Sequence, residues 1–496
     1  MGNENSKPVS NMPASTNQQP DNQREAHGES STKLARRLGL FDATMIVMGG
    51  IIGAGIFINP SAVAKQVHTP FLILSAWVLG GLIALAGAFI YAELAARRPF
   101  VGGQYAYLRE AYHPAVAFMY GWTLLLVIQT GAMAAVAVTF AVYFLEVTRL
   151  PLPDWAVASL ALALLTFINC LSVRAGSSVQ NAFMVTKIIA VVALVATGLF
   201  FSNAPPLPFS PALDRPASLG LLLALGAAMT PVMFSYGGWQ NASFIAGELR
   251  EPRRDLARGF LIGVFGVIFL YLSVSWVYVQ VLGADGLAAT RIPASDVMRR
   301  ALGPRGASLI AVGIAVSTFG FLSQGMLTAP RVYFAMAKDG LFFRNVAWVH
   351  PSTRVPVIAI ALQGAFAIVI ALTGKYEQIL NYVVSVDFIW FGLTAICIFI
   401  FRRRAVNILS TSNSEDRRNS LDTSSATDAT NELEEKNAIS GFRVPGHPFT
   451  TIFFVAACWL VVFSTIYKYP QNSIIGLLIM LAGIPVFFLW RGRRDG

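Results

Sequence analysis

The chain has 496 residues, of which 55% are apolar and 13% are charged, and its formal net charge is +11. A soluble protein of this size carries roughly 25% charged residues, so the composition excludes an ordinary water-soluble globular protein and indicates a membrane protein. The three cysteines (Cys170, Cys397 and Cys458) all fall within apolar segments, which predicts no disulfide framework.

Apolar runs recur along the chain at about the 20 residues that cross the hydrocarbon core of a bilayer. We therefore predict an all-α integral membrane protein with twelve transmembrane helices. The predicted spans are residues 43–66, 70–96, 115–146, 153–173, 179–201, 218–247, 257–282, 306–336, 355–373, 377–401, 449–467 and 471–490.

Polar segments flank and interrupt these spans. Residues 1–38 are rich in Asn, Ser, Gln and Pro, and we predict a disordered cytoplasmic tail there. Residues 39–404 hold the first ten spans and form the predicted transport core. Residues 405–440 are rich in Ser, Thr and acidic side chains, which predicts a disordered cytoplasmic loop. Residues 441–496 contain the last two spans and a short carboxy-terminal tail.

Both termini are predicted to be cytoplasmic, because an even number of spans places them on one side. The segments on that side hold most of the Lys and Arg, including Arg36, Arg37, Arg97, Arg98 and the run 402–404. Cytoplasmic loops are enriched in these residues, so we expect a multi-pass protein of a cell membrane, inner or plasma. The net charge then reflects topology and not a nucleic-acid surface, since the basic residues are scattered over separate loops.

Glycine interrupts the first span in the sequence IVMGGIIGAGIFINP (residues 46–60), and Pro and Gly interrupt the sixth span in PVMFSYGGWQN (residues 231–241). The two spans are five apart, so the second would be inverted relative to the first. Paired interrupted helices of this kind are the best sequence indication of a transporter's binding site. For the first span alone, close helix packing through the pair Gly49 and Gly53 is an equally good explanation.

An unwound first span would present free amides and the positive end of a helix dipole at Gly53–Gly55, where a carboxylate binds. Carbonyls left unpaired near Ile51, and near Phe234, Ser235 and Gly237 on the sixth span, would accept hydrogen bonds from an ammonium group. The two breaks together predict a site for the zwitterion of an α-amino acid.

Lys187 lies within the fifth predicted span, and a lysine inside a membrane is by default a candidate functional residue. Its ammonium would take the place of a bound sodium ion, between carbonyls of the first span near Gly50 and hydroxyls of the eighth span such as Ser317. This arrangement predicts sodium-independent transport. Two alternatives stay open: Lys187 carries a coupled proton, or it reaches the membrane surface and has no coupling role.

Three acidic residues lie in or at the ends of spans. Glu93 and Glu248 are close in sequence to arginines, and we predict interfacial salt bridges for both. Asp387 lies deeper in the tenth span, where it either relays protons or bonds to a neighbouring helix. No His, Cys or carboxylate cluster has metal-ligand spacing, and no nucleophile or phosphate-loop motif occurs. We therefore predict no catalytic residue, no metal site, no cofactor and no enzymatic activity.

Several stretches resemble the amino acid–polyamine–organocation superfamily, and within it the L-type amino acid transporters and bacterial serine/threonine exchangers. The resemblance covers residues 40–402 and rests on GGIIGAGIF, YAELAARRPFVGGQYAYLREAY, QNAFMVTKIIAVVAL, FSYGGWQNASFIAGELREPRRDL and STFGFLSQGMLTAPRVYFAMAKDGLF. It implies a five-plus-five inverted-repeat fold, whose first and sixth helices unwind at the midplane, and alternating access around spans 1, 3, 6 and 8.

The resemblance also implies roles for individual residues. The residues that would contact the substrate are Ile51, Gly53, Ala54, Gly55, Phe234, Ser235, Gly237 and Gln240. Phe234 would act as a hydrophobic gate, and Lys187 matches the position equivalent to a sodium site. Gln240 stands where L-type transporters often carry Asn, so side-chain specificity does not transfer. The loop EVTRLPLPD lacks the cysteine that joins animal members to a heavy chain, and no disulfide-linked heavy chain is expected.

The sequence thus predicts a sodium-independent permease or exchanger that moves neutral amino acids across a lipid bilayer, with proton coupling left open. The first alternative is an antiporter of cationic amino acids or polyamines, in which Asp387 supplies an anionic wall. The second alternative is a membrane sensor or scaffold in which the loop 405–440 recruits a partner.

Overall fold

The computed structural model describes residues 38–99, 102–171, 176–201, 211–351, 355–373, 375–415 and 442–492. Within these ranges the secondary structure is helical, apart from one isolated backbone bridge between Leu38 and Leu249. In these ranges eleven helices are long and apolar enough to span a membrane. The prediction of an all-α membrane protein is therefore confirmed. The ninth predicted span corresponds to a shorter apolar helix, Val357–Thr373.

The helices follow the predicted spans closely, and several begin at a proline, whose fixed φ suits the first helical position and whose missing amide costs nothing there. Their bounds are α2 Leu40–Ile51, α3 Gly55–Ala64, α4 Pro70–Arg97, α5 Gln104–Ala111, α6 Pro114–Thr123, η1 Leu124–Ile128, α7 Gln129–Thr148, α8 Asp154–Leu171, α9 Gly176–Phe200, α10 Leu219–Tyr236, η2 Trp239–Glu248, α11 Pro252–Ala289, α12 Pro293–Thr328, α13 Pro330–Lys338, η3 Arg344–Ala347, α14 Val357–Thr373, α15 Tyr376–Glu415, α17 Phe449–Lys468 and α18 Pro470–Gly492.

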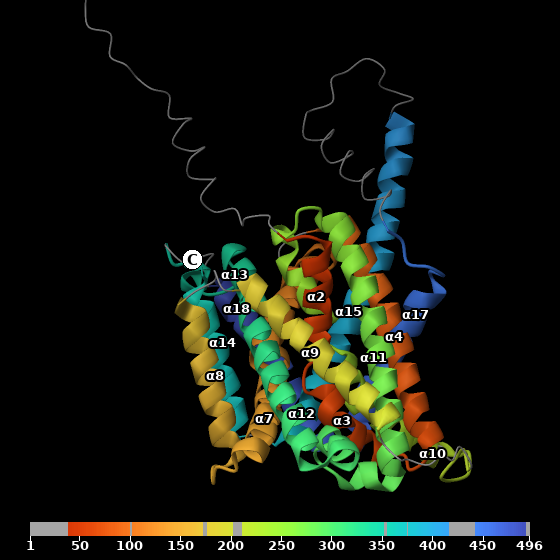
Figure 1. Cartoon of the computed structure of the whole chain (residues 1–496). Helices are drawn as coiled ribbons and strands as arrows, with labels where there is room; N and C mark the ends of the chain where they lie inside the picture. Colours follow the sequence, from red (N-terminus) through yellow and green to blue (C-terminus); the bar gives the residue numbers. More distant parts are fainter. Residues whose placement is uncertain are drawn as a thin grey trace, which may run out of the picture.

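The long helices run side by side as a bundle, with α2 above α3 in one broken line (Figure 1). Helix α4 packs along α11, α12 lies between α7 and α9, and α8 pairs with α14 at the edge of the bundle (Figure 1). The amino-terminal end of α2 and the carboxyl-terminal end of α18 lie at the same end of the bundle (Figure 1). Helix α15 continues to Glu415, so the first part of the predicted loop 405–440 is helical. The rest of that loop, and the predicted tail up to residue 37, lie outside the described residues.

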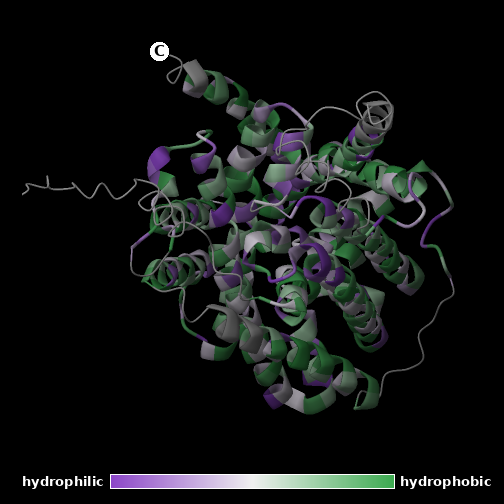
Figure 2. Cartoon of the chain, turned by 90° about the horizontal axis from the view of Figure 1, so that it is seen from above, coloured by the Kyte–Doolittle hydropathy of each residue, from purple (hydrophilic) through white to green (hydrophobic). Residues whose placement is uncertain are grey.

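Large apolar side chains cover the outside of the bundle. Seen from above, hydrophobic residues predominate on the perimeter helices, and hydrophilic residues gather in the loops and towards the middle (Figure 2). Leu160, Phe265, Phe269, Leu309 and Phe488 are among the exposed ones. A soluble monomer does not leave so much contiguous apolar surface in water, so this surface faces lipid.

Ion pairs close the end of the bundle that carries the described termini. Glu93 is fully buried and accepts hydrogen bonds from Arg97, Arg402 and the amide of Val444. The prediction of a salt bridge at Glu93 is therefore confirmed. Glu248 also forms one, but its partner is Arg331 of α13, at 2.8 Å, because α13 packs against η2.

Candidate functional site

The first predicted span is broken between Ile51, where α2 ends, and Gly55, where α3 begins. The amide of Gly53 turns back to the carbonyl of Ile51 at 2.8 Å, and the amide of Phe57 bonds to the carbonyl of Ala54 at 3.0 Å. No described residue accepts a hydrogen bond from the amides of Ala54, Gly55 or Ile56. Free amides at a helix start are suited to a carboxylate.

The carbonyls on the other side of this break already have partners. Ile51 O accepts from the hydroxyl of Tyr271 at 3.0 Å as well as from the amide of Gly53. Both of its lone pairs are thus in use, so the carbonyl of Ile51 itself is not free to bind an ammonium group. Lys187 donates to the carbonyl oxygens of Gly49 and Ile52, at 3.4 and 2.9 Å.

The sixth predicted span breaks between α10, which ends at Tyr236, and η2, which begins at Trp239. Gly238 has a φ of +103°, a backbone conformation that favours glycine. Its amide donates to the side chain of Gln240 at 3.0 Å. The two breaks touch here, since a Cβ on Gly50 would lie 2.5 Å from the carbonyl oxygen of Gly238. Only glycine at both positions allows this approach.

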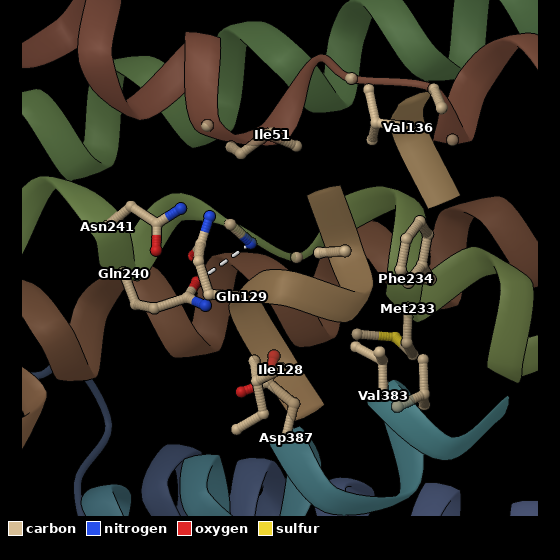
Figure 3. Close-up of a pocket in the computed structure, with 18 of the residues that line it drawn as sticks. Ile51, Ile128, Gln129, Val136, Met233, Phe234, Gln240, Asn241, Val383 and Asp387 are labelled. Carbon is tan, nitrogen blue, oxygen red and sulfur yellow. Dashed lines mark hydrogen bonds between the residues drawn. The ribbon is translucent and has the colours of Figure 1, made fainter. Parts of the chain in front are cut away.

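A cavity lies beside the crossing, with about 50 Å³ of space for the centres of water molecules. Figure 3 shows the α2–α3 break along one side and α15 along the other, with Gln129, Gln240 and Asn241 grouped at one end. Phe234, Met233 and Val383 gather at the opposite end (Figure 3). The cavity therefore has a polar end and an apolar end.

Most of the site residues predicted from the sequence line this cavity, namely Gly50, Ile51, Gly53, Ala54, Gly55, Phe234, Gly237 and Gln240. Ser235 does not: its hydroxyl accepts from Asn59 at 2.8 Å and donates to the carbonyl of Pro231 at 2.8 Å. A Cβ on Gly55 would lie 2.6 Å from that hydroxyl. Ser235 therefore packs behind the break, between α3 and α10.

Several lining residues carry no signal in the sequence. They are Ile128, Gln129, Ala132, Val136, Met233, Asn241, Phe321, Val383, Val384 and Phe388. Ile128 ends the π-helical turn η1, whose residues LLLVI include neither Gly nor Pro. Such turns often mark functional sites, but here only the structure reveals the turn.

Lys187 is fully buried and does not line this cavity. Its ammonium lies 5.7 Å from the centre of the Phe321 ring, and that ring also contacts Gly53 and lines the cavity. The hydroxyl of Ser317 is buried and has no hydrogen-bond partner among the described residues, so it does not bond to Lys187. Phe321 is thus the side chain that separates Lys187 from the cavity.

Asp387 is the one charged side chain among the described residues that line the cavity. The part of the chain that the structure describes contains no group of three or more His, Cys, Asp or Glu side chains that could hold a metal ion. The site is therefore built from backbone groups, amides, apolar side chains and a single carboxylate.

Known proteins match the chain over nearly its whole length. The sequence profile of the amino acid permease family matches residues 38–490. The serine/threonine exchanger SteT of Bacillus subtilis is 28% identical over 470 residues, which are 93% of this chain and 98% of that protein. The large neutral amino acids transporter small subunit 2 of Homo sapiens and the Asc-type amino acid transporter 1 of Mus musculus are each 28% identical over 93% of this chain and 82% of their own length. The resemblance seen in the sequence is thereby confirmed, and the chain belongs to the amino acid permease family.

Proposed function

We propose that this permease is a sodium-independent exchanger of small neutral amino acids that works by alternating access. The observation that carries the proposal is the pair of helix breaks that meet at Gly50 and Gly238 beside a small cavity. The unpaired amides of Ala54, Gly55 and Ile56 would hold the substrate's carboxylate. The carbonyls at the end of α10, near Phe234 and Gly237, would receive its ammonium group.

The size of the cavity favours a small substrate. About 50 Å³ is room for roughly three to five water molecules, each needing ~10–15 Å³ on this measure. That is comparable to the heavy atoms of a small amino acid. The similar proteins named above include one named for serine and threonine and one named for large neutral amino acids. Of these substrates, the volume of the cavity favours the smaller ones.

Sodium independence rests on Lys187. Its ammonium already bonds to Gly49 O and Ile52 O, carbonyls that a bound cation would otherwise use. We further propose twelve transmembrane helices, with Val357–Thr373 as the ninth, in the five-plus-five inverted-repeat arrangement. The helices α2–α3 and α10–η2 are then the two spans unwound at the midplane, and both termini are cytoplasmic. No disulfide-linked heavy chain is needed in this proposal.

Transport in reconstituted vesicles tests the proposal. Purified protein is placed in liposomes preloaded with unlabelled serine, and uptake of labelled serine or alanine is followed in sodium-free buffer. We expect uptake that depends on the internal amino acid and does not change when sodium is added. Uptake that requires a sodium gradient would refute sodium independence, and uptake without internal amino acid would refute obligatory exchange.

A further inference from the structure

The carboxylate of Asp387 faces the cavity without a partner. It lines the cavity, and no described residue forms a hydrogen bond or an ion pair with it. An ionised carboxylate is costly at membrane depth unless another group satisfies it. A hydrogen-bond donor on a molecule that enters the cavity would supply this partner.

Helix α15 places Asp387 on the wall of the cavity. Val383, Val384, Asp387 and Phe388 all line the cavity, and their spacing puts them on one face of the helix. This face lies across the cavity from the α2–α3 break (Figure 3). A substrate whose carboxylate rests on the amides of α3 would thus extend its side chain towards α15.

Apolar groups surround most of this route. Ile128, Val383 and Phe388 flank the position, and in Figure 3 the side chain of Asp387 lies next to that of Ile128. In such surroundings a hydrogen bond to a charged acceptor is stronger than in water, and its loss leaves the acceptor unsatisfied. A site of this kind rejects an analogue that lacks the donor much better than one that is simply larger.

We propose that Asp387 determines specificity, by accepting a hydrogen bond from a short substrate side chain that carries a hydroxyl or an ammonium group. The inference rests on the proposed amino acid exchange and adds to it the chemical class of the side chain. Two donors fit this chemistry, a neutral hydroxyl and a cationic amine. The amine would also neutralise the carboxylate.

Isosteric pairs of competitors test the role of Asp387. Threonine and valine differ by a hydroxyl in place of a methyl group, as serine and alanine differ by a hydroxyl. In the wild-type protein we expect threonine to compete with labelled alanine at concentrations about tenfold or more below those of valine. Equal competition by threonine and valine would overturn the proposal, and this measurement needs no variant.

Two substitutions of Asp387 distinguish a hydroxyl donor from an ammonium donor on the substrate side chain. In Asp387→Leu, which has similar volume and no acceptor, the ratio of valine to threonine inhibition constants should fall to about one. In Asp387→Asn, a side-chain oxygen can still accept from a hydroxyl, so the preference for threonine should survive in part. Any preference for 2,3-diaminopropionate over serine should disappear in this variant.

Asp154→Asn serves as the control, because Asp154 is exposed at the start of α8, and it should keep the wild-type ratio. A wild-type ratio in Asp387→Leu would refute the inference. If the wild-type protein exchanges no amino acid at all, the proposed function fails instead, so the two failures are distinguishable. Elution of each variant from a gel-filtration column shows whether it is folded.

Discussion

A single buried lysine links the break in the first span to the neighbouring helix. Lys187 of α9 is fully buried, yet its ammonium has two carbonyl partners and a nearby aromatic face. Carbonyls at the end of α2 have lost their helical partners, and burial without a donor would destabilise them. Lys187 therefore donates hydrogen bonds to carbonyls at the helix break, whatever its role in transport.

Replacing this lysine should weaken transport strongly. In Lys187→Ala the carbonyls of Gly49 and Ile52 lose their donor, so the break should lose the geometry that holds the substrate. We expect the exchange rate to fall at least about tenfold, which corresponds to roughly 1.4 kcal/mol. Exchange of labelled serine in proteoliposomes measures the effect.

Lys65→Ala is the matched control. Lys65 is exposed and lies 3.9 Å from Glu377, a surface pair that contributes little. This variant should exchange at the wild-type rate. If Lys187→Ala also exchanges at that rate, the role assigned to Lys187 is wrong.

At the scale of elements, the crossing of two broken helices fixes the shape of the site. A Cβ on Gly238 would lie 2.0 Å from the carbonyl oxygen of Gly50, and that oxygen belongs to a backbone that cannot easily shift. The positive φ of Gly238 adds a second reason for glycine. Alanine substitutions can separate the effect of the contact with Gly50 from the effect of the positive φ.

Gly238→Ala should be much more damaging than Gly283→Ala. Gly283 has a φ of +72° and a ψ of 170° but no atom within 4 Å of its Cβ position, so alanine there meets only conformational strain, about 1–3 kcal/mol. Gly238→Ala adds a clash with the α2 backbone and should abolish exchange. Melting temperatures in detergent and exchange rates compare the two variants. Similar losses in both would mean that strain, and not the contact between the breaks, explains the glycine.

The glycine pattern predicted where the helices break, because unwinding needs residues that reach unusual backbone angles. It could not predict that Tyr271 donates to the carbonyl of Ile51, since this side chain comes from a helix far away in the sequence. The π-helical turn before Gln129 was also invisible. In the structure, the hydroxyl of Thr130 donates to Leu125 O, a carbonyl within this turn. Such details depend on packing between spans, which composition does not encode.

For the whole molecule, apolar runs predicted the helices well because hydrocarbon demands a fixed length of apolar chain. The predicted ion-pair partners and helix bounds were less accurate at the ends of spans, because contacts between distant segments determine them. Glu248 pairs with Arg331, not with its neighbours in sequence, and α15 runs past the predicted boundary at 404. Charge alone located an interfacial pair at Glu93, but not its partners Arg402 and Val444.

Glu93 joins three segments of the chain that are far apart in the sequence. Its carboxylate bonds to Arg97 of α4, to Arg402 of α15 and to the amide of Val444, which precedes α17. The contacts with Arg402 and Val444 connect α4 to α15 and to the residues before α17. Because the carboxylate is fully buried, removing its charge leaves the two arginines uncompensated.

Glu93→Gln should therefore destabilise the protein by roughly 3–5 kcal/mol, the usual cost of breaking a buried charge pair. A lower melting temperature in detergent would reveal the loss. Glu251→Gln is the control, since Glu251 forms an exposed pair with Arg254, and its melting temperature should not change. Combining Glu93→Gln with Arg402→Gln should cost less than the sum of the single changes, because the second change removes one of the charges left without a partner. If the two costs are simply additive, Glu93 and Arg402 act independently and their ion pair does not hold α4 to α15.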